Sequence, residues 1–481
     1  MRSTQPPAKL FDEGKPMPFV RPAWARTCRE DDLRLRGHNT NREGAHMRTR
    51  SFLFLLSIGV FLFTGCSRTS SEQGAQGEQP KPPSAKANPV TLQVASQGAS
   101  TVLDEEFKHV VQSFLEKKYP HITLNYNPES AGTSLDALLA AGTIPDLIVT
   151  FNGNLASYKE KELVSDMTPL FRTSNIDLNR FEPGYLNDVK NASDKGEMYG
   201  LPINVNYHAM YYNKDIFDKF GTTYPTDGMN WEQLIDLAKK VTRMDGGTQF
   251  RGLDPGSTIV WMSQPLSIAA IDPKTDIASV HNDKWNRVFK LAKSIYDIPG
   301  NGIITPTPKD QFMKSKTLAV LLDLNILTQL SAAGKEGLNW DVAQYPSYTE
   351  KPNTYGNASV YVMLATKTGK HRDEASKAIE LITSEEVQLA LSKKGRLSPL
   401  KSDQVKQALG ADNPDLKGKR LPSIFKSIPV AYPVASPYRG KAESILINKF
   451  REFVNGSMDE NTALGQAEEE INKMVATEKS K

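Results

Sequence analysis

The side chain of this sequence that is most clearly placed for a chemical reaction is the thiol of Cys66. Arg48 and Arg50 begin a segment that continues as an apolar run of about 13 residues, 51–63. That length fits the apolar region of a secretory signal and is too short to span a bilayer permanently. Gly65 places a small residue directly before the cysteine. We expect the signal to be removed and the thiol to be acylated.

The residues before Cys66 resemble the lipobox of bacterial lipoproteins. Thr64 and Gly65 are small, as in that motif, whereas Phe63 stands where an aliphatic residue is usual. The alternative is an ordinary signal peptide followed by an incidental cysteine. Acyl chains such as palmitate attach a protein to a membrane because each buried CH₂ group contributes about 0.8 kcal/mol, and two chains make the attachment stable. The resemblance implies a lipoprotein anchored to the cell membrane on its extracytoplasmic face.

This signal also divides the chain. We expect the signal peptide at residues 47–65, which makes residues 1–46 an N-terminal extension without a structural role. Residues 66–88 hold no aromatic and no large aliphatic side chain, so they cannot bury enough surface to offset the entropy of ordering. They are predicted to form a flexible tether. The residues from 89 onward are too many for one core and suit two lobes.

The charge of the chain after the signal argues against nucleic acid as a partner. Residues 1–65 contain 11 of the 59 Lys and Arg residues and 6 of the 55 Asp and Glu residues, which leaves 48 basic against 49 acidic side chains. The basic character of the whole sequence therefore belongs to its leader. Cys66 is the only cysteine after the signal, so disulfides within the mature chain and cysteine-based metal sites are excluded.

Motifs for catalysis, cofactors and metals are absent from the sequence. It has no Gly-x-Ser-x-Gly, no His-Glu-x-x-His, no phosphate-binding glycine loop and no acid–base pattern of a glycosidase. The segment 272–276 has two aspartates that suit either a structural calcium or, more simply, a solvated turn. We therefore predict a protein that is not an enzyme and has no cofactor and no metal. Histidines after the signal are isolated from one another in the sequence: His109, His121, His208, His281 and His371.

Strands and helices are expected to alternate at the start of the folded part. Residues 90–94, 122–126 and 145–149 have the pattern of strands, and 105–118 and 135–141 that of helices between them. This order predicts an α/β fold with a mostly parallel sheet. Ligands of such sheets bind beyond the carboxyl ends of the strands. The candidates at these ends are Ser96, Gln97, Phe151 and Asn152.

An ordered series of short motifs follows in the middle of the chain. It reads Gly-Thr-Ile-Pro-Asp at 142–146, Gly-Leu-Pro-Ile-Asn at 200–204, Tyr-Tyr-Asn-Lys-Asp at 211–215 and Asn-Trp-Glu-Gln at 230–233. Placed behind a lipobox, this series resembles the extracellular solute-binding proteins of carbohydrate ABC importers, the family that includes maltose-binding protein. The resemblance covers nearly everything from residue 90 to the end.

The resemblance implies a two-lobed, type II periplasmic-binding-protein fold in which the chain crosses between lobes three times. The crossings are expected near 203–206, 353–357 and 426–434. Lobe 1 would then hold 89–204 and 357–426, and lobe 2 would hold 205–356 and 427–481. A ligand binds between such lobes, and closure around it presents a docking surface to the permease. We expect a monomer.

Site residues follow from the resemblance together with the chemistry of sugars, which offer apolar ring faces and hydroxyl groups. Trp261, Tyr355 and Tyr438 are expected to stack on the ligand, with core packing as the alternative for Trp261. Asn206 and Tyr207 lie at the first crossing and complete the set.

One segment departs from the family's usual pattern. Asp323 and Asn325 stand where the family carries a glycine and an aromatic residue, so a preference for maltodextrin-type ligands does not transfer. Their polar groups are expected either to bind ligand hydroxyls or to cap a helix. Arg439, beside Tyr438, leaves an acidic sugar open as a ligand.

Together these features predict a substrate-binding lipoprotein. It would capture an extracellular sugar or oligosaccharide and deliver it to the transmembrane subunits of an ABC permease. Two alternatives stay open: a carbohydrate-active enzyme attached to the surface, and a sensing subunit that presents its ligand to a membrane receptor.

Overall fold

The computed structural model describes residues 88–99, 102–130, 132–256, 259–303 and 307–480 of the 481-residue chain. All of them belong to one structural unit, Pro83–Lys481. The predicted extension, the signal peptide, the lipidation site Cys66 and nearly all of the tether lie outside the described residues. Within the described residues, no helix combines the length and the apolar character that crossing a bilayer requires.

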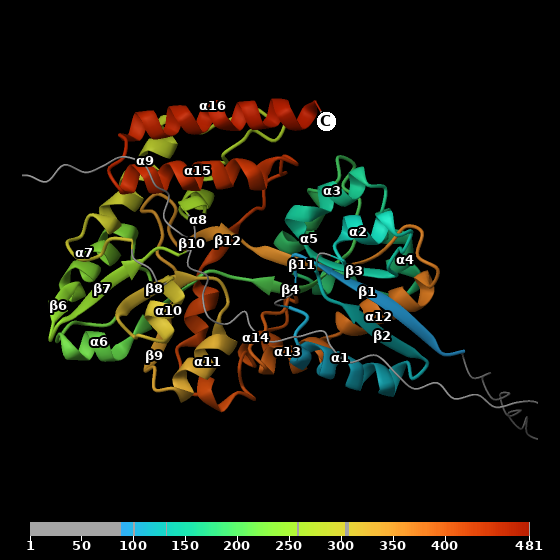
Figure 1. Ribbon diagram of the computed structural model, residues 1–481. Coiled ribbons are helices and arrows are strands. Elements are labelled where there is room, and N and C mark those ends of the chain that lie inside the picture. The colour runs from blue at the N-terminus through green and yellow to red at the C-terminus, as the bar shows by residue number, and fades with distance from the viewer. Residues whose placement is uncertain (1–87, 100–101, 131, 257–258, 304–306, 481) are drawn as a thin grey trace, which may run out of the picture. The chain divides into compact units, whose positions relative to one another are not determined.

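The first of two five-stranded sheets has the strand order β2-β1-β3-β11-β4 (Figure 1). Its strands are β1 (Val90–Gln97), β2 (Ile122–Asn127), β3 (Leu147–Phe151), β4 (Leu201–Asn206) and β11 (Ser359–Ala365). Strand β1 runs parallel to both β2 and β3, whereas β11 is antiparallel to β3 and β4. Gln97 pairs with Thr150, so the carboxyl ends of β1 and β3 lie at the same edge. The predicted α/β fold and its first strands are confirmed. The expectation of a mostly parallel sheet is wrong for its strand pairs, because β11 enters this sheet antiparallel to both of its neighbours.

Helix α1 shows why the sequence forms helices where it does. It spans Glu105–Lys118, and the carboxylate of Asp104 caps it by accepting a hydrogen bond from the amide of Phe107 at 2.9 Å. Acidic residues occupy its first turn and basic residues its last, which suits the helix dipole. Phe107, Val111 and Leu115 form its buried face, as the helical spacing predicts.

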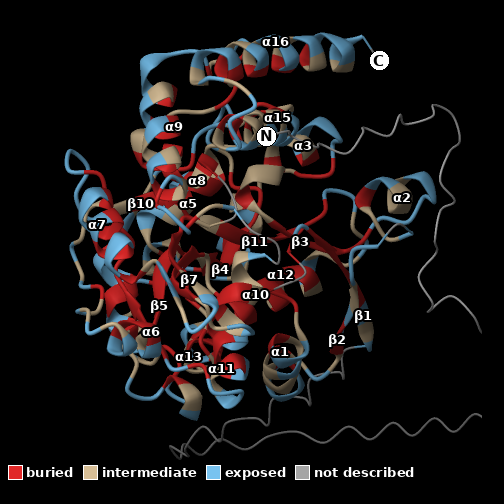
Figure 2. Ribbon diagram, turned by 60° about the vertical axis from the view of Figure 1, so that its left-hand side comes forward, coloured by how far each residue is buried: buried red, intermediate tan, exposed pale blue. Residues whose placement is uncertain are grey.

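The second sheet has the order β6-β7-β8-β5-β9. Its strands are β5 (Ala209–Asn213), β6 (Arg243–Asp245), β7 (Thr248–Asp254), β8 (Leu318–Asp323) and β9 (Trp340–Ala343). Strands β7 and β8 are parallel neighbours, so their last residues, Asp254 and Asp323, end at one edge. Figure 2 shows that the strands of both sheets are largely buried, whereas the helices around them expose one face.

The remaining helices cover the two sheets. Helix α12 packs against β1 and β11, α5 against β4 and β11, and α7 against β7 and β8. The last two helices, α15 and α16, lie side by side, as Figure 1 shows. The bounds of the helices after α1 are α2 (Leu135–Ala140), α3 (Leu155–Glu160), α4 (Thr168–Thr173), α5 (Pro183–Lys190), α6 (Lys214–Lys219), α7 (Trp231–Val241), α8 (Ile259–Ser263), α9 (Asp283–Tyr296), α10 (Pro308–Met313), α11 (Leu327–Lys335), α12 (Arg372–Ile382), α13 (Glu385–Lys393), α14 (Asp403–Gln407), α15 (Arg439–Val454) and α16 (Glu460–Lys479).

Two described segments lead from a strand of one sheet to a strand of the other, and β12 (Ile428–Val430) lies beside the second of them. Strand β4 of the first sheet leads through Tyr207 and His208 into β5 of the second. Strands β10 (Thr354–Asn357) and β12 form a separate parallel pair, and β10 continues into β11. Gly356 in β10 packs so tightly on the side chain of Gln264 that a Cβ would collide with it. The amide oxygen of Gln264 accepts a hydrogen bond from Asn357 N at 3.0 Å.

The lobe boundaries stay a prediction. Contacts of residues 413–426, which the prediction assigns to lobe 1, reach elements of the second sheet. Lys419 Nζ donates to the carbonyl oxygen of Trp340 at 2.6 Å, and Arg420 Nη2 pairs with Asp227 at 3.1 Å. These contacts favour a third crossing that begins before residue 419.

Candidate ligand-binding site

The ends of β1 and β3 bring four predicted site residues to one edge of the first sheet. The side-chain amide of Gln97 is fully engaged there: Nε2 donates to the carbonyl of Thr133 at 3.1 Å, and Oε1 accepts from Leu135 N at 3.0 Å. Gln97 therefore holds the start of α2. The ring of Phe151 lies against Gly98, and Ser96 Oγ is buried without a hydrogen-bond partner.

Asn152 has an unsatisfied donor. The residue is 3% exposed and begins the short 3₁₀ turn after β3. Its side-chain oxygen accepts a hydrogen bond from Val360 N at 3.2 Å, whereas Nδ2 is buried and has no partner among the described residues. Leaving such a donor unpaired costs about 1–3 kcal/mol. The protein thus keeps a group that a ligand oxygen would satisfy.

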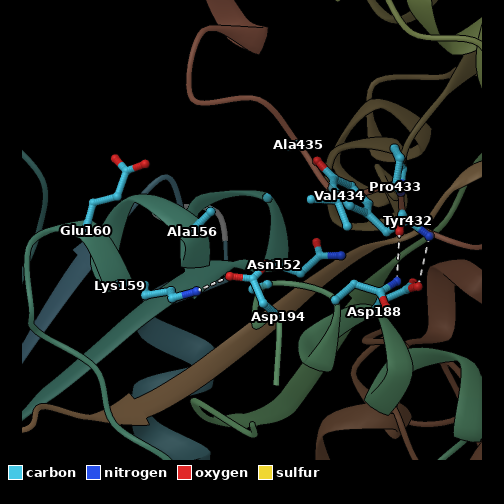
Figure 3. A pocket seen from close by; sticks show the side chains of 13 residues that line it. Asn152, Ala156, Lys159, Glu160, Asp188, Asp194, Tyr432, Pro433, Val434 and Ala435 are labelled. Carbon is cyan, nitrogen blue, oxygen red and sulfur yellow. Dashed lines mark hydrogen bonds and ion pairs between the residues drawn. The ribbon is translucent and has the colours of Figure 1, made fainter. Parts of the chain in front are cut away.

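Asn152 lines a pocket of about 290 Å³ between α3, the end of α5 and the segment after β12. Figure 3 shows Asp188 and Tyr432 at one end of this pocket and the ion pair of Lys159 with Asp194 near the other. The segment 432–435 supplies the wall that faces the helices. The volume lies at the lower end of the range of about 300–1,000 Å³ for small-molecule sites.

Helix α5 and the loop after it form hydrogen bonds to both the backbone amide and the backbone carbonyl of Tyr432. The carboxylate oxygen Oδ1 of Asp188 accepts a hydrogen bond from Tyr432 N at 2.8 Å. Asn191 Nδ2 donates to the carbonyl oxygen of Tyr432 at 3.1 Å. This clamp fixes the segment after β12 against the first sheet's helices.

Negative charge dominates the described lining of the pocket. The carboxylates of Glu160, Asp188 and Asp194 face a single ammonium, that of Lys159, which pairs with Asp194 at 2.8 Å. Burial raises the pKa of the Asp188 carboxyl to about 6, and the hydrogen bond from Tyr432 N opposes this shift. A carboxylate in this position has a strong need for a donor or a cation.

A second group of predicted residues belongs to an aromatic cluster around His208. The rings of Trp261, Tyr345 and Tyr355 lie 4.9, 5.4 and 5.4 Å from the His208 ring, and Tyr355 stacks on it. His208 is 2% exposed, no described residue hydrogen-bonds to its Nδ1, and burial lowers its pKa to about 3. Tyr355 is also 2% exposed, whereas Trp261 is half-buried. Of the two, Trp261 is the ring that keeps exposed surface.

Asn206, Tyr207 and Asn325 come together in a hydrogen-bond network. The backbone amide of Asn325 donates to Asn206 Oδ1 at 3.0 Å, and the Tyr207 hydroxyl donates to Asn325 Oδ1 at 3.1 Å. Asn325 Oδ1 also accepts from Leu327 N at the start of α11, and Nδ2 donates to the carbonyl of Gly395 at 3.2 Å. The side chain of Asn325 therefore supports the first turn of α11 from outside the helix, since the N-cap position expected for it is occupied by Ile326.

Asp323 lies beside the aromatic cluster, because it pairs in the second sheet with Ala209, the residue after His208. Asp323 lines a second pocket of about 370 Å³ with Asp254 and Lys309. Its buried carboxylate pairs with Lys309 Nζ at 3.1 Å, and burial raises its pKa. Tyr438 is half-buried at the start of α15, under the ammonium of Lys479.

Arg439 is engaged inside the protein. Its guanidinium pairs through Nε with Glu443 at 3.0 Å and contacts the hydroxyl of Tyr432. An acidic ligand would have to compete with Glu443 for this charge.

Sequence reasoning missed Asp188, Asn191 and Tyr432. The sequence around Asp188 could have indicated a site. Asp188 lies next to Val189 and two residues from Leu186, both buried in α5. A carboxylate in such a position needs a partner. Tyr432 and Asn191 had no such indication, because their place depends on β12 returning to the first sheet's helices.

Comparison of the sequence with models of known protein families identifies the family to which the chain belongs. The model of the bacterial extracellular solute-binding proteins matches residues 110–418. The chain belongs to this family. Membership confirms the predicted resemblance and places the working protein on the extracytoplasmic side of the membrane. Solute-binding proteins of this family are binding proteins rather than enzymes.

Individual relatives are distant. A protein of Brucella abortus named as a binding protein is 25% identical over 346 residues, 69% of this chain and 81% of that one. The melibiose/raffinose/stachyose-binding protein of Bacillus subtilis is 25% identical over 259 residues, 51% of this chain and 53% of its own. An ABC substrate-binding protein of Listeria monocytogenes in complex with cycloalternan has a TM-score of 0.66 at 18% identity, covering 81% of this chain and 100% of that one. The last likeness shows the fold of a solute-binding protein.

Proposed function

We propose that this solute-binding protein captures an extracellular sugar or oligosaccharide and delivers it to the permease of an ABC importer. The observation that carries the proposal is the pocket at Asn152 and Asp188. Among the described residues, the buried amide nitrogen of Asn152 has no partner there, and the carboxylate of Asp188 accepts one hydrogen bond, from Tyr432 N. Hydroxyl groups are both donors and acceptors, so a sugar satisfies both groups. The relatives that carry sugar names or sugar ligands support this ligand class.

A binding measurement with neutral oligosaccharides tests the proposal. Isothermal titration of the purified full chain, followed by recovery and chromatography of the ligand, is expected to show saturable binding of an unchanged sugar. Conversion of the sugar to products would replace the proposal with a surface-attached enzyme. Saturable binding of amino acids or peptides in place of every sugar tested would remove the sugar from it.

We further propose that Cys66 anchors the protein to the membrane by its acylated thiol. The apolar segment before it and the tether of residues 66–88 support this. Cys66→Ser is expected to move the protein from the membrane fraction to the soluble extracytoplasmic fraction without changing sugar affinity, because about 20 residues separate it from β1. Retention of the variant in the membrane would mean that the apolar segment itself is the anchor.

A further inference from the structure

Asp188 has an acceptor that the described protein leaves unused. The residue is 5% exposed and lies in the wall of the pocket at Asn152. Its Oδ1 accepts the hydrogen bond from Tyr432 N, whereas no described residue donates to Oδ2. No cationic side chain of the described residues pairs with it either. A nearly buried carboxylate with one neutral hydrogen bond is poorly stabilised as an anion.

The groups around Asp188 do not compensate its charge. Its titratable neighbours are Tyr185 of the same helix, Tyr355 of β10 and Tyr432. Burial raises the pKa of all three phenols, and the charge of Asp188 adds to this rise. All three are therefore neutral at physiological pH. The guanidinium of Arg439, which contacts the hydroxyl of Tyr432, is itself paired with Glu443.

The rest of the pocket adds negative charge. Lys159 is committed to Asp194 at 2.8 Å, and Glu160 brings a further carboxylate. Acidic residues alone do not define a site, but Asn152 is independent of them. Its buried Nδ2 has no partner in the described part of the chain, and its side chain points toward the wall at 432–435 (Figure 3). The pocket thus offers one unused donor and one unused anionic acceptor.

We infer that this pocket takes a sugar that carries a protonated amino group, with the ammonium at Asp188 Oδ2 and a hydroxyl or ring oxygen at Asn152 Nδ2. The inference rests on the proposed function and names the class of sugar. An ammonium meets the carboxylate with a charge-assisted hydrogen bond, which is roughly twice as strong as the neutral bond from a hydroxyl. Uronates and sugar phosphates are repelled by the same carboxylates.

A matched pair of disaccharides tests this preference. The β-1,4-linked disaccharide of glucosamine and cellobiose differ in an amino group against a hydroxyl at position 2 of each ring. Isothermal titration of the full chain at pH 6.5 is expected to give an affinity for the glucosamine disaccharide at least about tenfold higher than for cellobiose. The N-acetylated disaccharide is expected to lose this advantage, and a galacturonate disaccharide to bind least.

Variants assign the preference to its residue. Asp188→Asn keeps an acceptor for Tyr432 N and removes the charge, so the two disaccharides are expected to bind within about twofold of each other. Asp236→Asn is the control, because Asp236 lies exposed on α7 and, among the described residues, its ion-pair partner is Lys239 of its own helix. It is expected to keep the wild-type preference.

The possible outcomes separate this inference from the proposed function. Cellobiose or another neutral oligosaccharide binding as tightly as the glucosamine disaccharide would overturn the inference and leave a sugar-binding protein. A preference that survives in Asp188→Asn would also overturn it. Failure of every sugar, charged or neutral, to bind would remove the proposed function itself. The wild-type comparison stands even if Asp188→Asn does not fold.

Discussion

The pocket at Asp188 and the aromatic cluster at His208 bury a titratable group in opposite ways. Tyr355 connects the two: its ring stacks on His208, and its pKa responds to the charge of Asp188. Asp188 opens onto a pocket of about 290 Å³, whereas His208 is packed among three rings. We call the pocket at Asp188 the open site, because its unused acceptor faces space that a ligand can occupy. We call the cluster at His208 the closed site, because the protein's own rings surround the imidazole.

The two sites also respond to acid with opposite signs. Burial disfavours the charged form of either group, so it raises the pKa of Asp188 and lowers that of His208. Protonation therefore removes a buried charge at Asp188 and creates one at His208, so acid lowers the cost of burial at the first site and raises it at the second. Each prediction below tests one side of this contrast.

The largest effect of pH is expected for His208→Phe in acid. The folded pKa of about 3 lies below the ordinary value of 6.5, so the unfolded chain binds the proton more readily and stability falls as pH drops from 6.5 toward 3. Between pH 7.5 and 4.5 this loss is about 3 kcal/mol. His208→Phe keeps a ring among the three aromatic neighbours and removes the titration. Urea unfolding at both pH values is expected to show a loss smaller by that amount.

The control for His208 is His109→Asn on the exposed side of α1. It is expected to leave the wild-type acid dependence in place. If His208→Phe lost as much stability in acid as the wild type, the acid dependence would not come from His208. The interpretation of the cluster as a site that excludes the charged imidazolium would then be wrong.

Asp188→Asn is expected to act in the opposite direction. The folded pKa of about 6 lies above the ordinary value of 3.8. The folded state therefore holds the proton more tightly, and the cost of the buried charge grows as pH rises through this window. Without ligand, the variant is expected to be more stable than the wild type, and its advantage at pH 7.5 should exceed that at pH 4.5 by about 2 kcal/mol. Equal unfolding free energies of variant and wild type at both pH values would show that Asp188 is compensated.

The sequence predicted the first sheet well because its signals are local. The alternation of strands and helices and the spacing of Phe107, Val111 and Leu115 are properties of neighbouring residues, and β1, α1, β2 and β3 formed close to the expected positions. The family resemblance then supplied the two-sheet architecture, which no local pattern specifies.

The site was harder to predict because its parts are distant in the sequence. Asn152 and Asp188 meet Tyr432 only after β12 has returned beside β10 and the following segment has packed on α5. Tyr355 was expected at the ligand, but a tyrosine next to a glycine in a polar segment does not reveal that His208 will cover its ring. Pairings over such separations depend on tertiary packing.

Trp261→Ala tests whether the aromatic cluster reaches the ligand at all. Trp261 is half-buried and meets the His208 ring edge-on at 4.9 Å, so part of the indole remains for stacking. Its loss is expected to weaken sugar binding about tenfold, taking the stacking of bases on aromatic rings as the analogue. Calorimetric affinity and the melting temperature without ligand measure the two roles separately.

Trp285→Ala is the matched comparison for Trp261. Trp285 is fully buried in α9 and donates its indole N–H to the carbonyl of Ala269 at 3.1 Å. Its truncation is expected to cost about 3–5 kcal/mol of stability. If Trp261→Ala lowered the melting temperature as much and left affinity unchanged, Trp261 would belong to the core and the cluster would be closed on every side.

The smallest effect is expected for Asn152→Ala, which removes the unused donor of the open site. The variant loses the hydrogen bond to Val360 N but also the unsatisfied Nδ2, so the two changes offset each other and stability is expected to stay within about 1 kcal/mol of the wild type. Sugar binding is expected to weaken about fivefold, the equivalent of about 1 kcal/mol for one neutral hydrogen bond. Asn461→Ala, at an exposed position in the first turn of α16, is the control and should change neither quantity. Unchanged affinity in Asn152→Ala would mean that Nδ2 stays unsatisfied in the complex, and the ligand would then be held by the carboxylate side of the pocket alone.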